Sequence, residues 1–316
     1  MLDKKIGAVS NACSHAPQEN ESNPKGTWKK LKRLLAKCGK GTGCTGAGSA
    51  TTDLKVKCNM FNRFFASCTM NLRSICSTTD QAFKKWLPQM EHSESFTFQQ
   101  FTDSEVRTAL RELKVKKATG VDGIPSRLLK DGAGILAYRL TIFFNLSVQQ
   151  CKIPGEWKKA KVTPLYKNGA KSDPKIFRPI SVLPVVSKVH ERLIHNQLAS
   201  YFEENNLLGR SQSGFRKKYS TETAVAHFAD QILMGMDKGL VAGAVFIDLA
   251  KAFDTIDHDV LIHKLKHYGV SNECLLWFKD YFCARKQFVT IDSHRSEELD
   301  IACGVPQGLT SMIYHL

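Results

Sequence analysis

The stretch from Val241 to Asp248, "VAGAVFID", constrains the fold most, because it places an aspartate at the end of a nearly continuous apolar run. Such a run is typical of a strand that is covered on both faces of its sheet. A buried carboxylate is costly unless something pairs with it. Asp248 is therefore expected to bind a metal ion or a basic partner, or to lie at a solvated strand end and cap the next turn.

Further carboxylates follow closely, at Asp254, Asp257 and Asp259. Mg²⁺ in proteins favours one or two carboxylates together with substrate phosphates, so a magnesium site at Asp248 is consistent with this pattern. The spacing lacks the glycine and the distal glutamate of an EF-hand. A zinc site lacks an evident third ligand, although three histidines lie in the same region: His258, His263 and His267. Magnesium binding and turn capping both remain open for Asp248.

The charge balance indicates a polyanionic partner. The chain of 316 residues carries a formal net charge of +15 and has a pI of about 9.3. Nucleic acid is the first candidate and an anionic membrane surface the second. No apolar run reaches the roughly 18–20 residues that span a bilayer, and the first residues lack the apolar core of a signal peptide. We therefore expect an intracellular protein, in nucleus or cytoplasm, that is not secreted and whose ten cysteines are free thiols.

Periodicity predicts an α+β protein in which helices and strands alternate irregularly. Residues 1–55 are basic and Gly/Thr/Ser-rich, and we expect them to be poorly ordered. Thr102 and Glu105 fit a capping box. Further helices are expected over residues 135–150, buried on most sides, and over 185–202, after Ser220, after Asp257 and after Ser271. Strands are expected over residues 161–167 and 241–248, and as a hairpin formed by 286–292 and 298–305.

Two loops invite a functional interpretation. "SGFRKKYST" places Arg216 and two lysines between a glycine turn and a helix start, which suits phosphate recognition as well as it suits a solvated basic turn. "GVPQG", from Gly304 to Gly308, is a turn that allows close backbone approach, and it is also compatible with an ordinary loop.

Six motifs taken in order identify a resemblance. They are "KKATGVDGIPSRLLK", "IPGEWKKAKVTPLYK", "FRPISVLPVVSKVHERLI", "SQSGFRKKYSTETAV", "AVFIDLAKAFDTIDHDVL" and "GVPQG". The series resembles the reverse transcriptase of non-long-terminal-repeat, LINE-type retrotransposons. It covers roughly residues 100–308, with a weaker match from Phe61.

The resemblance implies a right-hand polymerase fold with fingers over residues 101–240 and a partial palm over 241–308. A helical segment over residues 56–100 would precede the fingers, and residues 309–316 would be a divergent tail. The partners that the resemblance implies are an RNA template, a DNA primer and a deoxynucleoside triphosphate, with Mg²⁺ as the metal cofactor. Neither a membrane nor a small-molecule cofactor is implied.

The same resemblance assigns roles to individual residues. Asp248 takes the place of a catalytic metal ligand, and the carbonyl of Leu249 that of a second oxygen donor to the metal. Phe253 matches the aromatic side chain that lies under the incoming sugar and blocks a 2′-hydroxyl. The remaining nucleotide-binding positions are Gln307 and Gly308 near the nucleotide and template base, Arg216 near the triphosphate, and the basic positions Arg178 and Lys188.

The sequence departs from the family pattern after "GVPQG". Leu309 replaces the expected serine, and the family's Asp-Asp hairpin and thumb have no counterpart, so two of three expected catalytic carboxylates are missing. This departure predicts a truncated or frame-shifted reverse transcriptase domain that is inactive as written. The alternative is a non-catalytic nucleic-acid-binding remnant, and a basic scaffold protein of unrelated function is a third interpretation.

Overall fold

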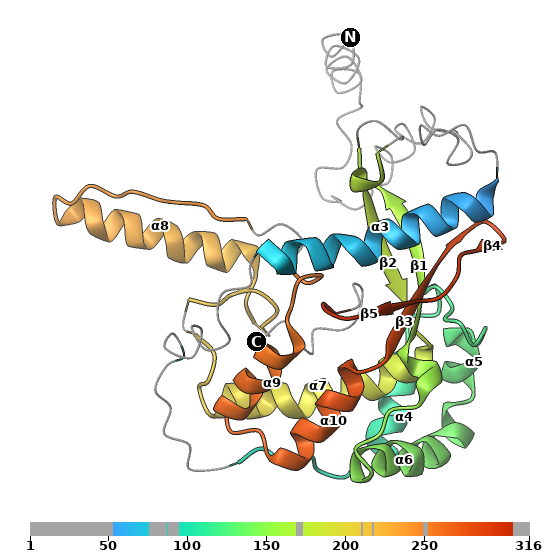
Figure 1. The fold of residues 1–316 in the computed structure, drawn as a ribbon. Coiled ribbons are helices and arrows are strands. Elements are labelled where there is room, and N and C mark those ends of the chain that lie inside the picture. Colours follow the sequence, from blue (N-terminus) through green and yellow to red (C-terminus); the bar gives the residue numbers. More distant parts are fainter. Residues whose placement is uncertain are drawn as a thin grey trace, which may run out of the picture. The chain divides into compact units, whose positions relative to one another are not determined.

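The computed structural model describes residues 53–75, 87, 95–168, 173–209, 211–216, 218–248 and 252–305. All of them lie in the unit that runs from Ala47 to Leu316. The predicted poorly ordered region, residues 1–55, falls almost wholly outside the described residues, as do Leu249, Gln307 and Gly308. Figure 1 shows helices around a small twisted sheet, which confirms the mixed α and β class.

The helices begin where the sequence places capping residues. Thr102 forms a capping box with Glu105 at the start of α4, Ser220 caps α8, Asp257 caps α9, and Ser271 caps α10. The described helices are α3 (Leu54–Ile75), α4 (Asp103–Arg111), α5 (Ser126–Asp131), α6 (Ala133–Gln149), α7 (Val185–Glu204), α8 (Thr221–Asp237), α9 (His258–His267) and α10 (Asn272–Phe282), with short 3₁₀ turns at Gly155–Lys158 and Pro174–Ile176. No helix within these residues is long and apolar enough to cross a membrane.

The sheet joins segments that are far apart in the chain. Its strands are β1 (Lys159–Tyr166), β2 (Phe177–Val182), β3 (Arg285–Ile291), β4 (His294–Arg295) and β5 (Leu299–Ile301). β1 pairs with β2 in antiparallel and with β3 in parallel orientation, and β3 pairs with β4 and β5 in antiparallel orientation. The hairpin that the sequence predicts is therefore confirmed, and β3 also forms a parallel contact with β1, more than a hundred residues earlier in the chain.

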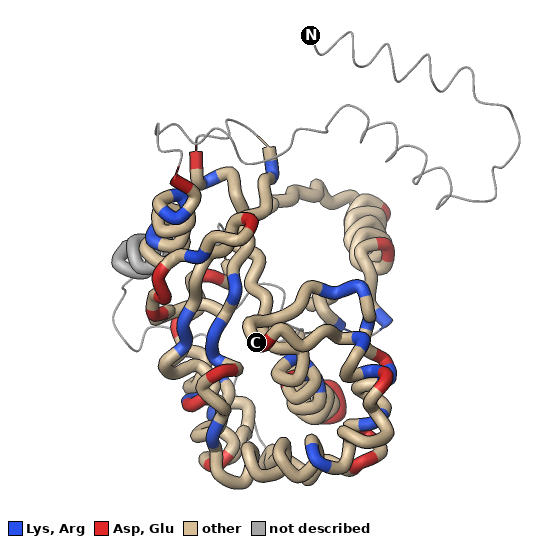
Figure 2. Tube along the Cα trace, turned by 90° about the vertical axis from the view of Figure 1, so that its right-hand side faces the viewer, with Lys and Arg blue, Asp and Glu red and all other residues tan. Residues whose placement is uncertain are grey.

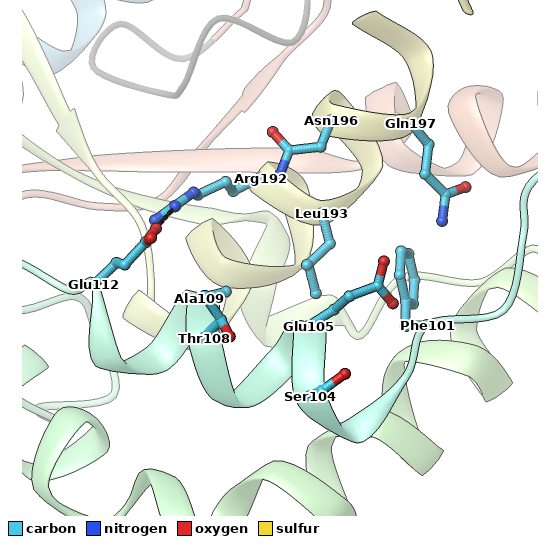
Figure 3. Close-up of a pocket in the computed structure, with 10 residues that line it drawn as sticks. All are labelled: Phe101, Ser104, Glu105, Thr108, Ala109, Glu112, Arg192, Leu193, Asn196 and Gln197. Carbon is cyan, nitrogen blue, oxygen red and sulfur yellow. Dashed lines mark hydrogen bonds and ion pairs between the residues drawn. The ribbon is translucent and has the colours of Figure 1, made fainter. Parts of the chain in front are cut away.

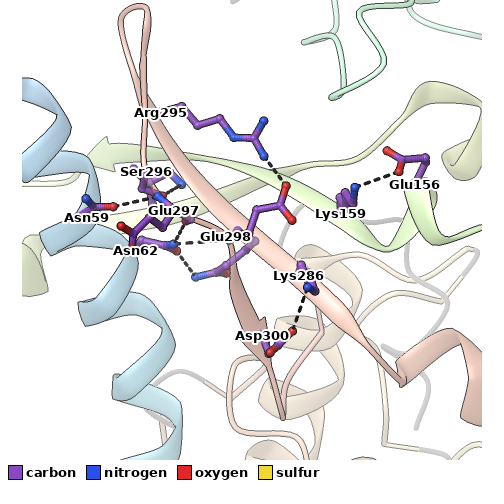
Figure 4. Close-up of polar contacts among 12 residues, drawn as sticks. Asn59, Asn62, Glu156, Lys159, Lys286, Arg295, Ser296, Glu297, Glu298 and Asp300 are labelled. Carbon is purple, nitrogen blue, oxygen red and sulfur yellow. Dashed lines mark hydrogen bonds and ion pairs between the residues drawn. The ribbon is translucent and has the colours of Figure 1, made fainter.

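One face of this sheet is covered by α3. Cys58, Phe61 and Phe65 from the helix pack against Val162 and Val289 from the central strands. A polar patch closes the edge of this contact, where the Asn62 amide donates to the carbonyl of Glu297 at 2.8 Å and the Gln287 amide donates to Asn62 at 3.1 Å (Figure 4). Because strand side chains alternate, Lys159 and Lys161 of β1 and Lys286 and Phe288 of β3 lie on the face away from α3.

The main core lies among α4, α6, α7, α9 and α10, with Trp277 fully buried in it. The ring of His190 stacks on Phe144 with ring centroids 4.6 Å apart and meets Trp277 edge-on at 5.6 Å. Burial lowers the pKa of His190 to about 3, so this imidazole is neutral and serves as a core aromatic ring.

Two sequence-based expectations are wrong in this structure. The helix expected over residues 135–150 exists as α6, but Ile135 is 84% exposed and Tyr138 62%, because only one stripe of its nearly all-apolar surface packs inward. Val241–Asp248 forms no strand and is exposed, with Val241 at 99% and Ile247 at 81%. An extended segment is stable as a strand only when a neighbour satisfies its backbone groups, and no described strand pairs with this one.

Candidate nucleic-acid and nucleotide site

Three of the sequence motifs meet at Phe253. The ring of Phe253 packs edge-on against Phe215 from the "SGFRKKYST" motif, with ring centroids 6.2 Å apart. The Val305 amide, at the start of "VPQG", donates to the carbonyl of Phe253 at 2.9 Å. We call this cluster of Phe215, Phe253 and Val305 the Phe253 junction. It brings together motifs that are separated by up to 90 residues in the chain.

Gly304 allows the junction to form. Its φ is +78°, a region that favours glycine, and its amide donates to the carbonyl of Ile256 at 2.8 Å. A Cβ atom built on Gly304 would lie 2.5 Å from the carbonyl oxygen of Asp254. Gly304, the first glycine of "GVPQG", is therefore required for close backbone approach, which was one of the two interpretations of this loop.

Arg216 follows Phe215 and is held by an acidic partner. Its guanidinium donates to both carboxylate oxygens of Glu203 on α7, at 3.0 and 2.7 Å, and lies 4.4 Å above the ring of Tyr219. The hydrogen bond and charge of Glu203 raise the pKa of Arg216. The residue predicted to lie near a triphosphate thus has its charge directed toward α7 in this structure.

The other predicted site residues lie on separate elements. Arg178 is exposed on β2, where it faces Leu165 across the ladder. Lys188 lies in the first turns of α7, and burial lowers its pKa while the charge of Glu191 opposes this effect. Asp248 is exposed at the end of the described segment 218–248. The structure brings Phe253 and the Arg216 segment together, whereas it does not bring Asp248, Arg178 or Lys188 to the junction through any contact described.

The face of the sheet away from α3 carries several basic residues. The ladder sets Lys159 opposite Lys286 and Lys161 opposite Phe288, on the side away from α3. The guanidinium of Arg295 lies 3.7 Å above the ring of Phe288 on the same side. We call this surface the basic sheet face; it comprises Lys159, Lys161, Arg178, Lys286 and Arg295, and Figure 2 shows lysine and arginine positions along neighbouring strands.

Acidic residues partly neutralise the basic sheet face. Lys159 pairs with Glu156 at 2.9 Å and Lys286 with Asp300 at 3.9 Å, and Arg295 pairs with Glu298 (Figure 4). These exposed pairs are weak in water, so a phosphate backbone can compete for the lysines. The alternation in "KAKV" (Lys159–Val162) is the sequence signal that could have revealed this face, but the register that adds Lys286 depends on a long-range parallel pairing.

A groove between α4 and α7, about 340 Å³ in volume, lies on other elements (Figure 3). Several of its polar side chains are already paired, since Arg192 forms an ion pair with Glu112 and the Gln197 amide bonds both backbone groups of Gln99 at 2.9 Å. The groove is thus a hydrogen-bonded junction between two helices, and none of the predicted site residues lines it.

The comparisons with known proteins agree with these observations. The family model of the reverse transcriptase (RNA-dependent DNA polymerase) matches residues 166–311, which include β2, β3 and the whole Phe253 junction. This match defines a reverse transcriptase domain over residues 166–311, and the mixed α and β fold is compatible with it.

Comparison with individual relatives indicates which kind of reverse transcriptase the domain resembles. The chain is 33% identical over 211 residues to the probable RNA-directed DNA polymerase from transposon BS of Drosophila melanogaster, covering 65% of this chain and 22% of that protein. It is 30% identical over 208 residues to the RNA-directed DNA polymerase from mobile element jockey of the same species, covering 66% and 23%. The chain thus contains a reverse transcriptase domain similar to those of non-long-terminal-repeat, LINE-type retrotransposons. It spans less than a quarter of the length of these two relatives.

Proposed function

We propose that this chain is the template- and nucleotide-facing part of an RNA-directed DNA polymerase. It would bind an RNA template, a DNA primer and a deoxynucleoside triphosphate, with fingers over residues 101–240 and a partial palm over 241–308. The observation that carries the proposal is the convergence of "SGFRKKYST", "AKAFD" and "GVPQG" at the Phe253 junction. The basic sheet face gives independent support, because a row of cationic side chains suits a phosphate backbone.

The residues available to hold metal ions indicate whether this chain could carry out polymerisation by itself. Asp248 with the carbonyl of Leu249 offers oxygen donors that suit Mg²⁺. Phosphoryl transfer by two metal ions needs more carboxylates than one to hold both ions. The 316 residues contain no adjacent Asp-Asp pair, and the described residues hold no group of three potential ligands. The donor set does not fit two ions, so we propose nucleic-acid binding without polymerase turnover for this chain, and we derive no catalytic step.

Binding of nucleic acid should be salt-sensitive and should depend on the basic sheet face. Changing Lys159, Lys161 and Lys286 to Gln removes up to three phosphate contacts. Each lost contact should reduce the slope of log affinity against log salt by about 0.7 to 0.9, because fewer counterions are released. A fluorescence-anisotropy titration of a primed RNA template at several salt concentrations measures this slope.

The matched control neutralises three lysines outside the described residues: Lys29, Lys30 and Lys32. This variant loses the same formal charge, so a general effect of net charge would change both variants equally. An unchanged slope in the sheet variant, or an equal loss in the control, would contradict the assignment of the basic sheet face to nucleic acid.

The role of Phe253 is testable in a fusion that joins residues 1–308 to the palm and thumb of the jockey polymerase. We expect Phe253→Ala to preserve deoxynucleotide incorporation and to admit ribonucleotides, because the ring would occupy the space that a 2′-hydroxyl needs. The measurement is the ratio of single-nucleotide incorporation efficiencies for the two sugars. A ratio that Phe253→Ala leaves unchanged in an active fusion would show that this residue has been assigned the wrong role.

A further inference from the structure

The cations of the basic sheet face differ in whether an acidic side chain already holds them. Three of them are in ion pairs: Lys159 with Glu156 at 2.9 Å, Lys286 with Asp300 at 3.9 Å, and Arg295 with Glu298. Within the part of the chain that the structure describes, no carboxylate forms an ion pair with Lys161 or Arg178. The face therefore contains two kinds of cation, paired and unpaired.

Lys161 lies on the strand that has a neighbour on each side. The register sets it opposite Val182 of β2 and opposite Phe288 of β3, which are only 7% and 3% exposed. Both neighbours are apolar, so the stem of Lys161 can lie on them while its ammonium group reaches water. Pairing of β1 with both strands fixes the backbone at Lys161, which gives its charge a defined position on the face.

A phosphate group gains different amounts from the two kinds of cation. Lys159 must give up its hydrogen bond to Glu156, which also raises the pKa of Lys159 in the free chain. Exchange of one exposed ion pair for another contributes little to affinity. Lys161 has no described ion pair to give up, so its contact with a phosphate adds its full effect.

We infer that Lys161 is the residue of the basic sheet face that anchors a phosphate backbone, and that Lys159, Lys286 and Arg295 add little to the affinity. The inference rests on the proposed function, because that proposal places nucleic acid on this face. It deepens the proposal by ranking the cations according to the ion pairs that they already form.

Arg178 is the second unpaired cation of the face. It lies opposite Leu165, four residues beyond Lys161 along β1, which corresponds to about 13 Å along the strand. Lys161 and Arg178 would therefore contact separate phosphates of one nucleic-acid strand.

The test compares two double variants of the full chain that have the same net charge. Lys161→Gln with Asp230→Asn removes the anchor and an exposed carboxylate on α8, whereas Lys159→Gln with Glu156→Gln removes one ion pair of the face. We expect the first variant to bind a primed RNA template about fivefold more weakly than the original chain, and the second to stay within about twofold. Fluorescence anisotropy at one fixed salt concentration measures these affinities.

A third variant separates the charge of Lys161 from its part in the strand. Lys161→Arg keeps the charge and should bind the RNA within about twofold of the original chain, while thermal melting verifies that all the chains compared are folded. Equal losses in the two double variants, or a loss in Lys161→Arg as large as in the Lys161→Gln variant, would overturn the anchoring role. Failure of the original chain to bind the RNA would instead contradict the proposed function, so the two failures are distinguishable.

Discussion

Primer extension by the fusion of residues 1–308 to the jockey palm and thumb should fall by at least about a hundredfold when Asp248 is changed to Asn. The reason is electrostatic. Asp248 is the one residue of this chain that the resemblance assigns as a catalytic carboxylate, and neutralising it would remove negative charge where nucleotidyl transfer depends on metal ions. Affinity for the primed template should change little, because phosphate contacts dominate that affinity.

Two controls are needed to interpret the loss of primer extension. Asp259 is exposed in the first turn of α9, and Asp259→Asn should leave extension nearly unchanged. The unfused chain should give no extension with Mg²⁺ or Mn²⁺, at the level of its own Asp248→Ala variant. Template-dependent incorporation by the unfused chain would contradict the proposal that the chain binds without turnover. Full activity of the fused Asp248→Asn variant would show that Asp248 is not the catalytic carboxylate.

Glu191→Ala should lower the free energy of unfolding by about 2–3 kcal/mol, because it would leave the buried hydroxyls of Ser187 and Tyr281 without their acceptor. Glu191 lies on α7, is 3% exposed, and accepts hydrogen bonds from Ser187 at 2.9 Å and from the Tyr281 hydroxyl at 3.2 Å. Arg285, 1% exposed, donates to the backbone of Tyr281 at 3.0 Å. These groups tie α7 to α10 and to the start of β3.

The matched control is Glu204→Ala on the same helix, where the side chain is exposed and the change should stay within about 0.5 kcal/mol. Urea unfolding followed by circular dichroism measures both variants. A loss for Glu191→Ala that is no larger than the loss for Glu204→Ala would contradict the buried cluster.

The same carboxyl predicts a pH dependence. Burial raises the pKa of Glu191 to about 7, and the charge of Arg285 and bonds from Ser187 and Tyr281 oppose this rise. As pH rises, the carboxyl of Glu191 therefore loses its proton at a lower pH in the unfolded chain than in the folded chain. The contribution of Glu191 to stability is complete below about pH 4.5 and declines as pH rises toward 7. The isosteric Glu191→Gln variant should lack this decline.

Local signals predicted much of the fold. Thr102, Ser220, Asp257 and Ser271 cap the helices that follow them, because capping depends on side chains within a few residues of the helix start. The pairing of strands that are far apart in the chain could not be predicted from such local signals. The parallel alignment of Lys159 with Lys286 joins positions more than a hundred residues apart, and only this register creates the basic sheet face.

The segment before Asp248 shows the limit of an argument from composition. Its apolar run is typical of a covered strand, yet Phe246 is 87% exposed and packs against Phe228 of α8 with ring centroids 6.1 Å apart. Burial of such a run depends on neighbouring strands, which the run itself does not encode. The role of Phe253 was suggested by family resemblance, but its contacts with Phe215 and Val305, and the contact between His258 and the carbonyl of Gly304, required the three-dimensional arrangement.

A crosslinking map of the 316-residue chain bound to a primed RNA template tests the central proposal most directly. Ultraviolet crosslinks identified by mass spectrometry should fall on the basic sheet face, at Lys159, Lys161 or Lys286, and on the segment that carries Phe215 and Arg216. Crosslinks confined to residues 1–52, or to the outer side of α6 around Ile135 and Tyr138, would contradict the assignment of the template-facing surface.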